Sequence, residues 1–218
     1  MSRAALLIAF FYLTTSLCGC GSSSGENQTF TVRIQADGFV PRSLNIKPGD
    51  TVVWVNGDTE PHRVVSGVLD QTVSPIILEP IAIKPDNTFV PDSVEANFGD
   101  AVRWRNDQVA HFVLDIVDNV GNVVASLDLE PGQIVPSPPT QLFPSAGRYT
   151  YQQRNLPQFF GTLTLFGVPD PDGNFDSGVL PTGGDFRRTF NSVGAFPFFD
   201  LDTSDPNKSF RTGQITIQ

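Results

Sequence analysis

The sequence predicts an all-β protein made of two β-sandwiches, and the first evidence is its length and composition. The chain has 218 residues, enough for one large β domain or two domains of about 100 residues each. It contains 18 Phe, 19 Gly and 18 Pro but only one Met, which suits short strands joined by tight turns. No stretch of the length of a helix carries apolar residues at helical spacing.

The second observation is an internal repeat, in which two stretches match at an offset of about 50 residues. The matching pairs are Phe39 and Phe89, Pro41 and Pro91, Gly49 and Gly99, Asp50 and Asp100, Trp54 and Trp104, and Asn56 and Asn106. His62 corresponds to His111 after a loop difference of one residue. Each copy has the pattern of a strand, a turn and a longer strand with alternating apolar positions.

The continuation of this unit also occurs twice, near residues 143–165 and again near residues 190–217. The order is therefore first half, first half, second half, second half. We expect a nested arrangement, because it leaves the connections unknotted. Residues 80–168 would form a domain inserted into an outer domain made of residues 29–68 and 170–218. The alternative, a crossed pairing of the halves, would interlock the two units.

The N-terminus has the pattern of a secretory signal. Arg3 precedes an apolar run over residues 4–13, which is too short for a comfortable membrane span. Leu17-Cys18-Gly19-Cys20 resembles the lipobox of bacterial lipoproteins, in which the Cys is acylated. We expect a signal peptide over residues 1–19 and a flexible tether over residues 20–28. The alternative is an ordinary cleaved signal without a lipid.

These features predict an exported protein of the cell envelope, held at a membrane by a lipid on Cys20. Both cysteines of the chain, Cys18 and Cys20, lie in this leader, so the remaining chain offers no disulfide and no thiolate ligand. The formal net charge is −9, and such a surface repels phosphate backbones. Nucleic acid is therefore not an expected partner.

The repeated motifs resemble the cupredoxin family, of the plastocyanin and amicyanin type. The family's first half has the form Phe-x-Pro, then Gly-Asp-x-Val-x-Trp-x-Asn, then a His, and both copies contain it. Its second half has Gly-x-Tyr-x-Tyr before a loop that carries a Cys, a His and a Met. The resemblance covers nearly everything after residue 28 and implies a Greek-key β-sandwich in each copy.

The sequence departs from the family in that loop. A blue-copper site needs two imidazoles, a thiolate and a weak axial thioether. In the inserted copy, Gln153, Leu156 and Phe159 stand at the positions of the Cys, His and Met. In the outer copy, Asp200 and Thr203 stand at the positions of the Cys and the second His. Each copy keeps one of the four copper ligands, so we expect no copper or other cofactor. Copper binding is kept only as the alternative that the family resemblance implies.

The two remaining histidines are the candidate metal ligands. His62, with Asp200 beside it, could form a weak site for zinc or copper(II). The alternative is a structural imidazole that is hydrogen-bonded near the rim of the sandwich. His111 is a remnant of the family's site, and we expect it to be held by packing near Leu156 and Phe159.

The predicted function is a non-enzymatic module of the cell envelope, which uses a cupredoxin scaffold for structure or for binding a protein partner that the sequence does not identify. No nucleophile with a base, paired catalytic acid or phosphate-binding loop has a local signature in the chain. We therefore expect no enzyme activity. The alternative is a copper-binding or electron-transfer protein of the plastocyanin-like family.

Overall fold

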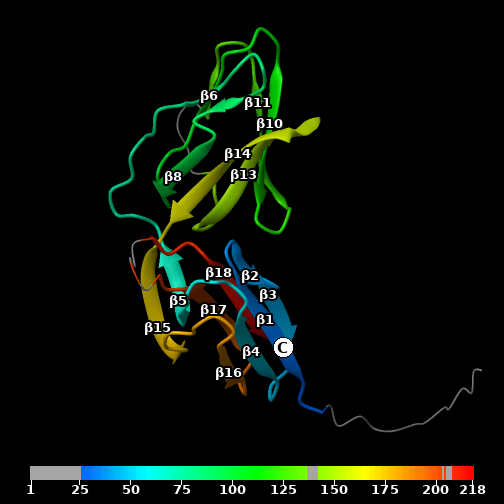
Figure 1. Ribbon diagram of the computed structural model, residues 1–218, viewed down its shortest axis with the longest axis vertical. Coiled ribbons are helices and arrows are strands. Elements are labelled where there is room, and N and C mark those ends of the chain that lie inside the picture. The colour runs from blue at the N-terminus through cyan, green and yellow to red at the C-terminus, as the bar shows by residue number, and fades with distance from the viewer. Residues whose placement is uncertain (1–25, 137–141, 203, 205–207) are drawn as a thin grey trace, which may run out of the picture.

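The computed structural model describes residues 26–136, 142–202, 204 and 208–218, and the named elements in them are all β-strands. This confirms the all-β class. The strands form four sheets, which pack in pairs as two sandwiches stacked along the long axis (Figure 1). We call them the lower sandwich, residues 29–70 and 168–217, and the upper sandwich, residues 81–166.

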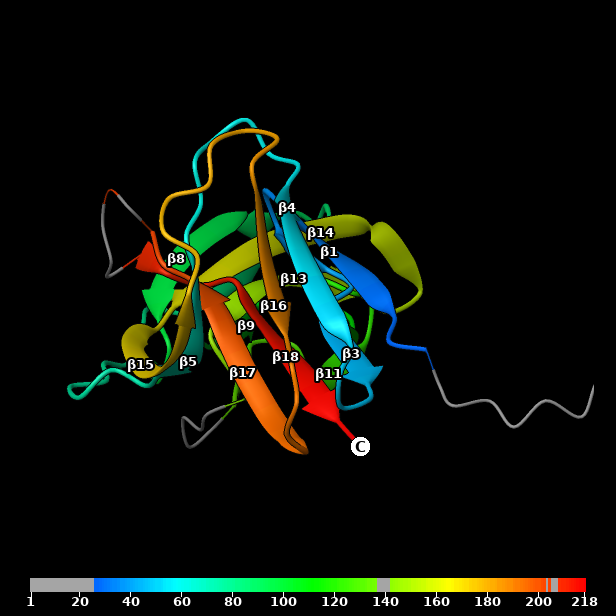
Figure 2. The same ribbon diagram turned by 90° about the horizontal axis from the view of Figure 1, so that it is seen from below.

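The lower sandwich consists of a four-stranded and a five-stranded sheet. The four-stranded sheet has the order β16 (Asp185–Thr189), β4 (Thr51–Asn56), β1 (Thr29–Gln35) and β2 (Gly38–Val40). The five-stranded sheet has the order β15 (Val168–Asp176), β5 (Val64–Asp70), β17 (Gly194–Asp200), β18 (Thr212–Ile217) and β3 (Ser43–Ile46). Seen from below, β16 and β4 run side by side, as do β17 and β18 (Figure 2).

The upper sandwich repeats this plan. Its four-stranded sheet has the order β12 (Ile134–Val135), β9 (Trp104–Asn106), β6 (Ile81–Ile83) and β7 (Phe89–Val90). Its five-stranded sheet has the order β11 (Val123–Leu129), β10 (Phe112–Asp118), β13 (Gly147–Gln153), β14 (Leu156–Phe166) and β8 (Ser93–Asn97).

The last strand of the chain, β18, pairs with early strands of the sequence. It runs parallel to β3, with Ile215 opposite Leu44, and antiparallel to β17, with Gly213 opposite Phe198. Asp70 and Val168, which flank the upper sandwich in sequence, are directly paired between β5 and β15. The nested pairing of sheets is thus present, whereas the insertion of one independently folding domain into another stays a prediction.

Each sandwich is closed around a fully buried tryptophan, which the alternating pattern of its strand directs inward. Trp54 in the lower core contacts a group of phenylalanine rings at centroid distances of 5.2–6.3 Å, namely Phe175, Phe186, Phe190 and Phe198. Trp104 in the upper core contacts Tyr151 at 5.7 Å. Side chains from both sheets of each pair contribute to these cores.

The sequence repeat corresponds to repeated hydrogen bonds. Asp50 accepts from the backbone N–H groups of Gln28 and Lys47, and Asp100 accepts in the same way from Ile76 and Asn97. Each carboxylate fixes a turn at the start of a strand by satisfying two backbone donors.

The two sandwiches meet around Phe210, which precedes β18. The guanidinium groups of Arg148 and Arg211 both lie over its ring, with their Cζ atoms 5.1 and 4.5 Å from the ring centroid. Arg148 of the upper sandwich also pairs with Asp37 of the lower one. Val65 and Leu69 of β5 pack with the upper core. Apolar packing, an ion pair and cation–π contacts therefore hold the junction.

Candidate functional site

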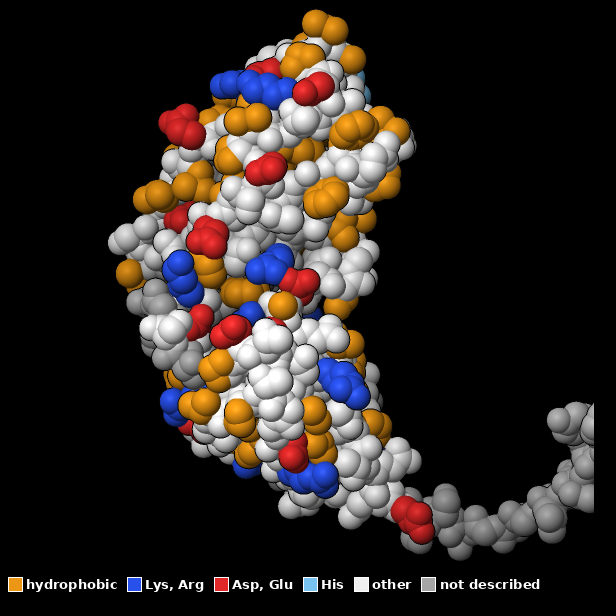
Figure 3. Space-filling view, viewed as in Figure 1, with side chains coloured by type: hydrophobic (Ala, Val, Ile, Leu, Met, Phe, Trp, Pro, Cys, Tyr) orange, Lys and Arg blue, Asp and Glu red, His pale blue; other side chains and the backbone are white. Residues whose placement is uncertain are grey.

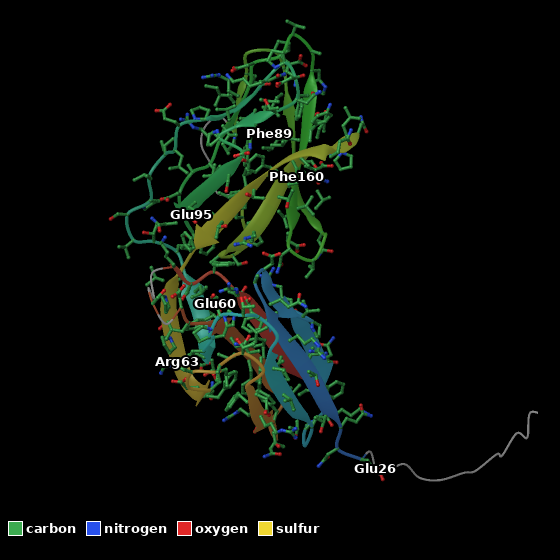
Figure 4. All side chains as sticks on the ribbon, viewed as in Figure 1. Glu26, Glu60, Arg63, Phe89, Glu95 and Phe160 are labelled. Atoms are coloured by element: carbon green, nitrogen blue, oxygen red, sulfur yellow. The ribbon has the colours of Figure 1, made fainter. Side chains whose placement is uncertain are left out.

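His62 is fixed by the loop that follows β4. Asn56, the last residue of β4, donates from Nδ2 to the carbonyl oxygens of Glu60 at 2.8 Å and Leu180 at 3.0 Å. His62 and Leu180 exchange both backbone hydrogen bonds, at 3.0 and 2.7 Å. Glu60 and Arg63, which flank His62 along the chain, lie in the lower sandwich (Figure 4). The His62 side chain is only 3% exposed, so its ring is held in one position.

Both ring nitrogens of His62 face carboxylates. Nδ1 lies 2.7 Å from Asp200 Oδ2, and Nε2 lies 3.2 Å from Asp58 Oδ2. A carboxylate only accepts hydrogen bonds, and an imidazole donates from both nitrogens only when it is protonated. The arrangement therefore fits an imidazolium that bridges two aspartates.

Asp200, at the end of β17, is the centre of this cluster. Its side chain is 2% exposed and accepts from the backbone N–H of Arg63 at 3.0 Å and from Arg211 Nη1 at 2.9 Å, besides His62. Two carboxylates, those of Asp58 and Asp200, thus meet two cations, His62 and Arg211. Buried charges are tolerated when they are paired and hydrogen-bonded in this way.

The pKa of His62 reflects the same contacts. Burial by itself lowers this pKa, but the hydrogen bond and charge of Asp200, together with Asp58, outweigh burial and raise the pKa above its ordinary value. Burial raises the pKa of Asp58, yet hydrogen bonds from Thr59 and His62 bring it below its ordinary value. Both shifts favour the charged forms, hence the ion-paired state of the cluster.

A small cavity of about 220 Å³ opens beside the cluster. The side chains around it are mostly charged or polar, and they are Glu60, Pro61, His62, Asp200, Asp202, Ser204 and Arg211. Such a lining admits water and small ions to one side of the cluster.

The donors of this cluster do not fit a blue-copper centre. They are oxygen atoms and one imidazole, whereas copper of that type needs a thiolate and a second imidazole. Hydrogen bonds to carboxylates occupy both nitrogens of His62. Among the described residues, no group of three His, Cys, Asp or Glu side chains could hold a metal ion. Thr203, which the sequence alignment predicts at the position of the second imidazole, and Cys20 lie outside the described residues.

The corresponding region of the upper sandwich is built differently. Gln153 ends β13 as Asp200 ends β17, and its Oε1 is buried without a hydrogen-bond partner among the described residues. His111 is 46% exposed, and its Nε2 lies 3.4 Å from Asp128 Oδ1. Leu156, which lies beside it in the alignment, is 37% exposed, and the structural role of His111 stays a prediction.

Sequence reasoning placed His62 and Asp200 together and missed their other two partners. Asp58 lies four residues before His62 in a polar turn, a spacing that carries no signal by itself. Arg211 reaches Asp200 from the start of the last strand. In the upper sandwich, Arg154 forms a two-pronged ion pair with Asp115, with its shortest contact at 2.7 Å, which the sequence also did not indicate.

The strand order, the paired sheets and the repeated motifs define a cupredoxin-like protein. The chain is 35% identical to a plastocyanin of Nostoc punctiforme over 69 residues, which cover 30% of this chain and 50% of that protein. The match thus spans about half the length of this relative. No family model matches the sequence.

Solved structures of the same class also resemble the chain. A purple cupredoxin from Nitrosopumilus maritimus is 15% identical with a TM-score of 0.34, over 87% of this chain and 99% of that one. A reduced amicyanin mutant is 18% identical with a TM-score of 0.32, over 46% and 98%. A copper-containing nitrite reductase from Thermus scotoductus is 11% identical with a TM-score of 0.24, over 88% and 99%. Because these scores are below 0.5, the fold assignment rests on the strand order and the sequence match.

In the part of the chain that the structure describes, no helix is long and apolar enough to cross a membrane.

Proposed function

We propose that the protein is a lipoprotein of the cell envelope whose two cupredoxin-like sandwiches serve as a structural or partner-binding module, without a type 1 copper site and without catalysis. The observation that carries this proposal is the position of Asp200. It occupies the place of the family's thiolate, and its carboxylate is hydrogen-bonded to His62 Nδ1 at 2.7 Å.

This contact supports a structural role for the cluster. An imidazolium that bridges two carboxylates has no lone pair left for a metal ion. Arg211 continues the cluster to the junction, since its guanidinium lies on the ring of Phe210 and donates to the carbonyl oxygen of Ala36 at 3.0 Å. Through Arg211, the charged cluster around Asp200 is therefore connected to the junction between the two sandwiches.

A second candidate is a copper-binding or electron-transfer protein. The similarity to a plastocyanin over 69 residues favours it. This candidate function requires a metal ion to bind through His62 and Asp200. The imidazole of His62 would then have to lose a proton and its hydrogen bond to a buried carboxylate, which is costly. Hard oxygen donors of this kind do not select copper(I), so a reversible one-electron couple would lack its stable reduced state.

Voltammetry separates the two candidates. The purified full chain is incubated with copper(II), washed free of unbound metal and examined for a reversible one-electron couple. The proposal predicts none, and a His62→Ala variant should give the same trace as the wild type. A reversible couple that this variant loses would establish the electron-transfer candidate instead.

A further inference from the structure

A cavity with a volume of about 650 Å³ lies between the two sandwiches. The space-filling view shows the molecule hollowed at this level (Figure 3). Its lining comes from both sandwiches and includes Arg42, Leu69, Phe98, Asp118, Ser145 and Thr212. Clefts of this volume at domain junctions are common binding sites for small molecules. We refer to it as the junction cleft.

Arg42 is the only Lys or Arg among the described residues that line the junction cleft. Its Nη2 donates to Ser145 Oγ at 3.1 Å and to Thr212 Oγ1 at 2.9 Å. A guanidinium has five N–H groups, so three remain, and no other hydrogen bond or ion pair from Arg42 to a described residue uses them. Two hydroxyl groups thus hold the guanidinium in place while the rest of its donors stay available.

The one acidic side chain of the described lining, Asp118, interacts with Arg42 electrostatically but forms no direct hydrogen bond or ion pair with it. Asp118 uses both carboxylate oxygens within its own turn: it accepts from the backbone N–H groups of Val120 and Asn122 and from the amide of Asn122, at 2.8–3.1 Å. Its hydrogen-bonding capacity is therefore largely engaged. Arg42 is therefore a fixed cation that no described carboxylate contacts directly.

Half of the remaining residues in the described lining carry apolar side chains, and the others are polar residues or glycines. Leu69, Phe98 and Phe198 are each less than 8% exposed and contribute to the wall, together with Pro144 and Pro197. Such a wall binds hydrocarbon by removing its surface from water. A fixed guanidinium beside it adds a charge-assisted contact for an anion, which a carboxylate fits well.

We propose that the junction cleft binds a small organic carboxylate with an apolar body. The carboxylate accepts hydrogen bonds from Arg42, and the apolar body lies against Leu69, Phe98 and the prolines. The ligand contacts both sandwiches, so binding stabilises their junction by mass action. This site is separate from the His62 cluster and does not depend on the proposed function.

Isothermal titration calorimetry of the full chain tests this proposal with two pairs of probes. The carboxylates are 3-phenylpropionate and hexanoate, and their neutral counterparts are 3-phenylpropionamide and hexanamide. We expect saturable one-to-one binding of at least one carboxylate, and at least tenfold weaker binding of its amide. Absence of saturable binding by both carboxylates, or equal binding of acid and amide, would overturn the proposal.

Variants locate the site. Arg42→Gln should weaken carboxylate binding at least tenfold, whereas Arg33→Gln, which changes an exposed residue of β1 outside the cleft, should leave it within twofold. Val68→Phe places a larger side chain in the lining and leaves residue 42 as Arg, and it should also weaken binding at least tenfold. Thermal unfolding of each variant checks that it is folded. Unchanged binding in both Arg42→Gln and Val68→Phe, or equally tight binding of inorganic phosphate, would contradict the site.

Discussion

His62 Nδ1 lies 2.7 Å from Asp200 Oδ2, although the two residues are 138 positions apart in the sequence. In the alignment with the cupredoxin family, Asp200 is expected at the position of the copper-binding cysteine, and its carboxylate lies beside His62. His62 and Arg211 supply the positive charges that this buried carboxylate needs.

Removing the Asp200 carboxylate should destabilise the lower sandwich. Asp200→Ala leaves His62, the backbone N–H of Arg63 and Arg211 without their buried partner. Breaking a buried ion pair from one side costs about 3–5 kcal/mol. We expect a loss of about 3 kcal/mol in the free energy of unfolding, measured with urea. Asp185→Ala, at a half-exposed ion pair on β16, is the control and should change it by less than about 1 kcal/mol.

The raised pKa of His62 predicts a pH dependence of stability. Because the pKa is higher in the folded than in the unfolded state, the contribution of the imidazolium is fully present below the unfolded value, about 6.5, and is lost as pH rises through the folded value. Unfolding free energies measured between pH 6 and pH 9 should therefore fall further in the wild type than in His62→Gln. Parallel pH profiles of the two proteins would refute the ion-paired histidine.

The upper sandwich should fold by itself. Asp70 and Val168 are directly paired in adjacent strands, so the two ends of the segment that forms the upper sandwich lie close together. A segment whose ends are close can be excised as a separate domain. We expect residues 80–168, expressed alone, to unfold cooperatively in urea. Their burial of Trp104 provides a fluorescence signal for this transition. A fragment that is unfolded in water would show that the two sandwiches form one folding unit.

Membrane attachment should depend on Cys20. The wild-type chain expressed in a bacterial host is expected to sediment with membranes, and Cys20→Ala to remain in the soluble fraction, since the Ser/Gly tether offers no other anchor. Cys18→Ala is the matched control and should behave as the wild type. Equal membrane partitioning of wild type and Cys20→Ala would exclude the lipid anchor.

The fold class and the repeat could be read from the sequence because they rest on patterns that the backbone imposes. The pairs Trp54 and Trp104 and Asp50 and Asp100 recur at the same spacing, and the structure gives each pair the same role in a core or a turn. The family alignment also placed Asp200 beside His62, because strand register determines where the end of β17 lies.

Other features of the site depend on side-chain packing, which no periodic pattern encodes. Asp58 reaches His62 from a turn, and Arg211 reaches Asp200 across a strand pairing, so both depend on rotamers of long or flexible side chains. The exposure of His111 was also not predictable from the repeat. The upper sandwich has Gln153 at the end of β13, where the lower sandwich has the buried carboxylate of Asp200 at the end of β17.

Copper titration of the purified full chain, followed by visible absorption and by bound copper per chain, tests the central claim most directly. We predict no intense copper–thiolate absorption band and less than one tightly bound copper ion per chain after excess metal is removed. A Cys18→Ser/Cys20→Ser variant serves as the control for binding by the leader and should give the same result. One tightly bound copper ion per chain in both the wild type and this variant would contradict the claim, because the variant contains no cysteine and the sandwiches themselves would then hold the copper.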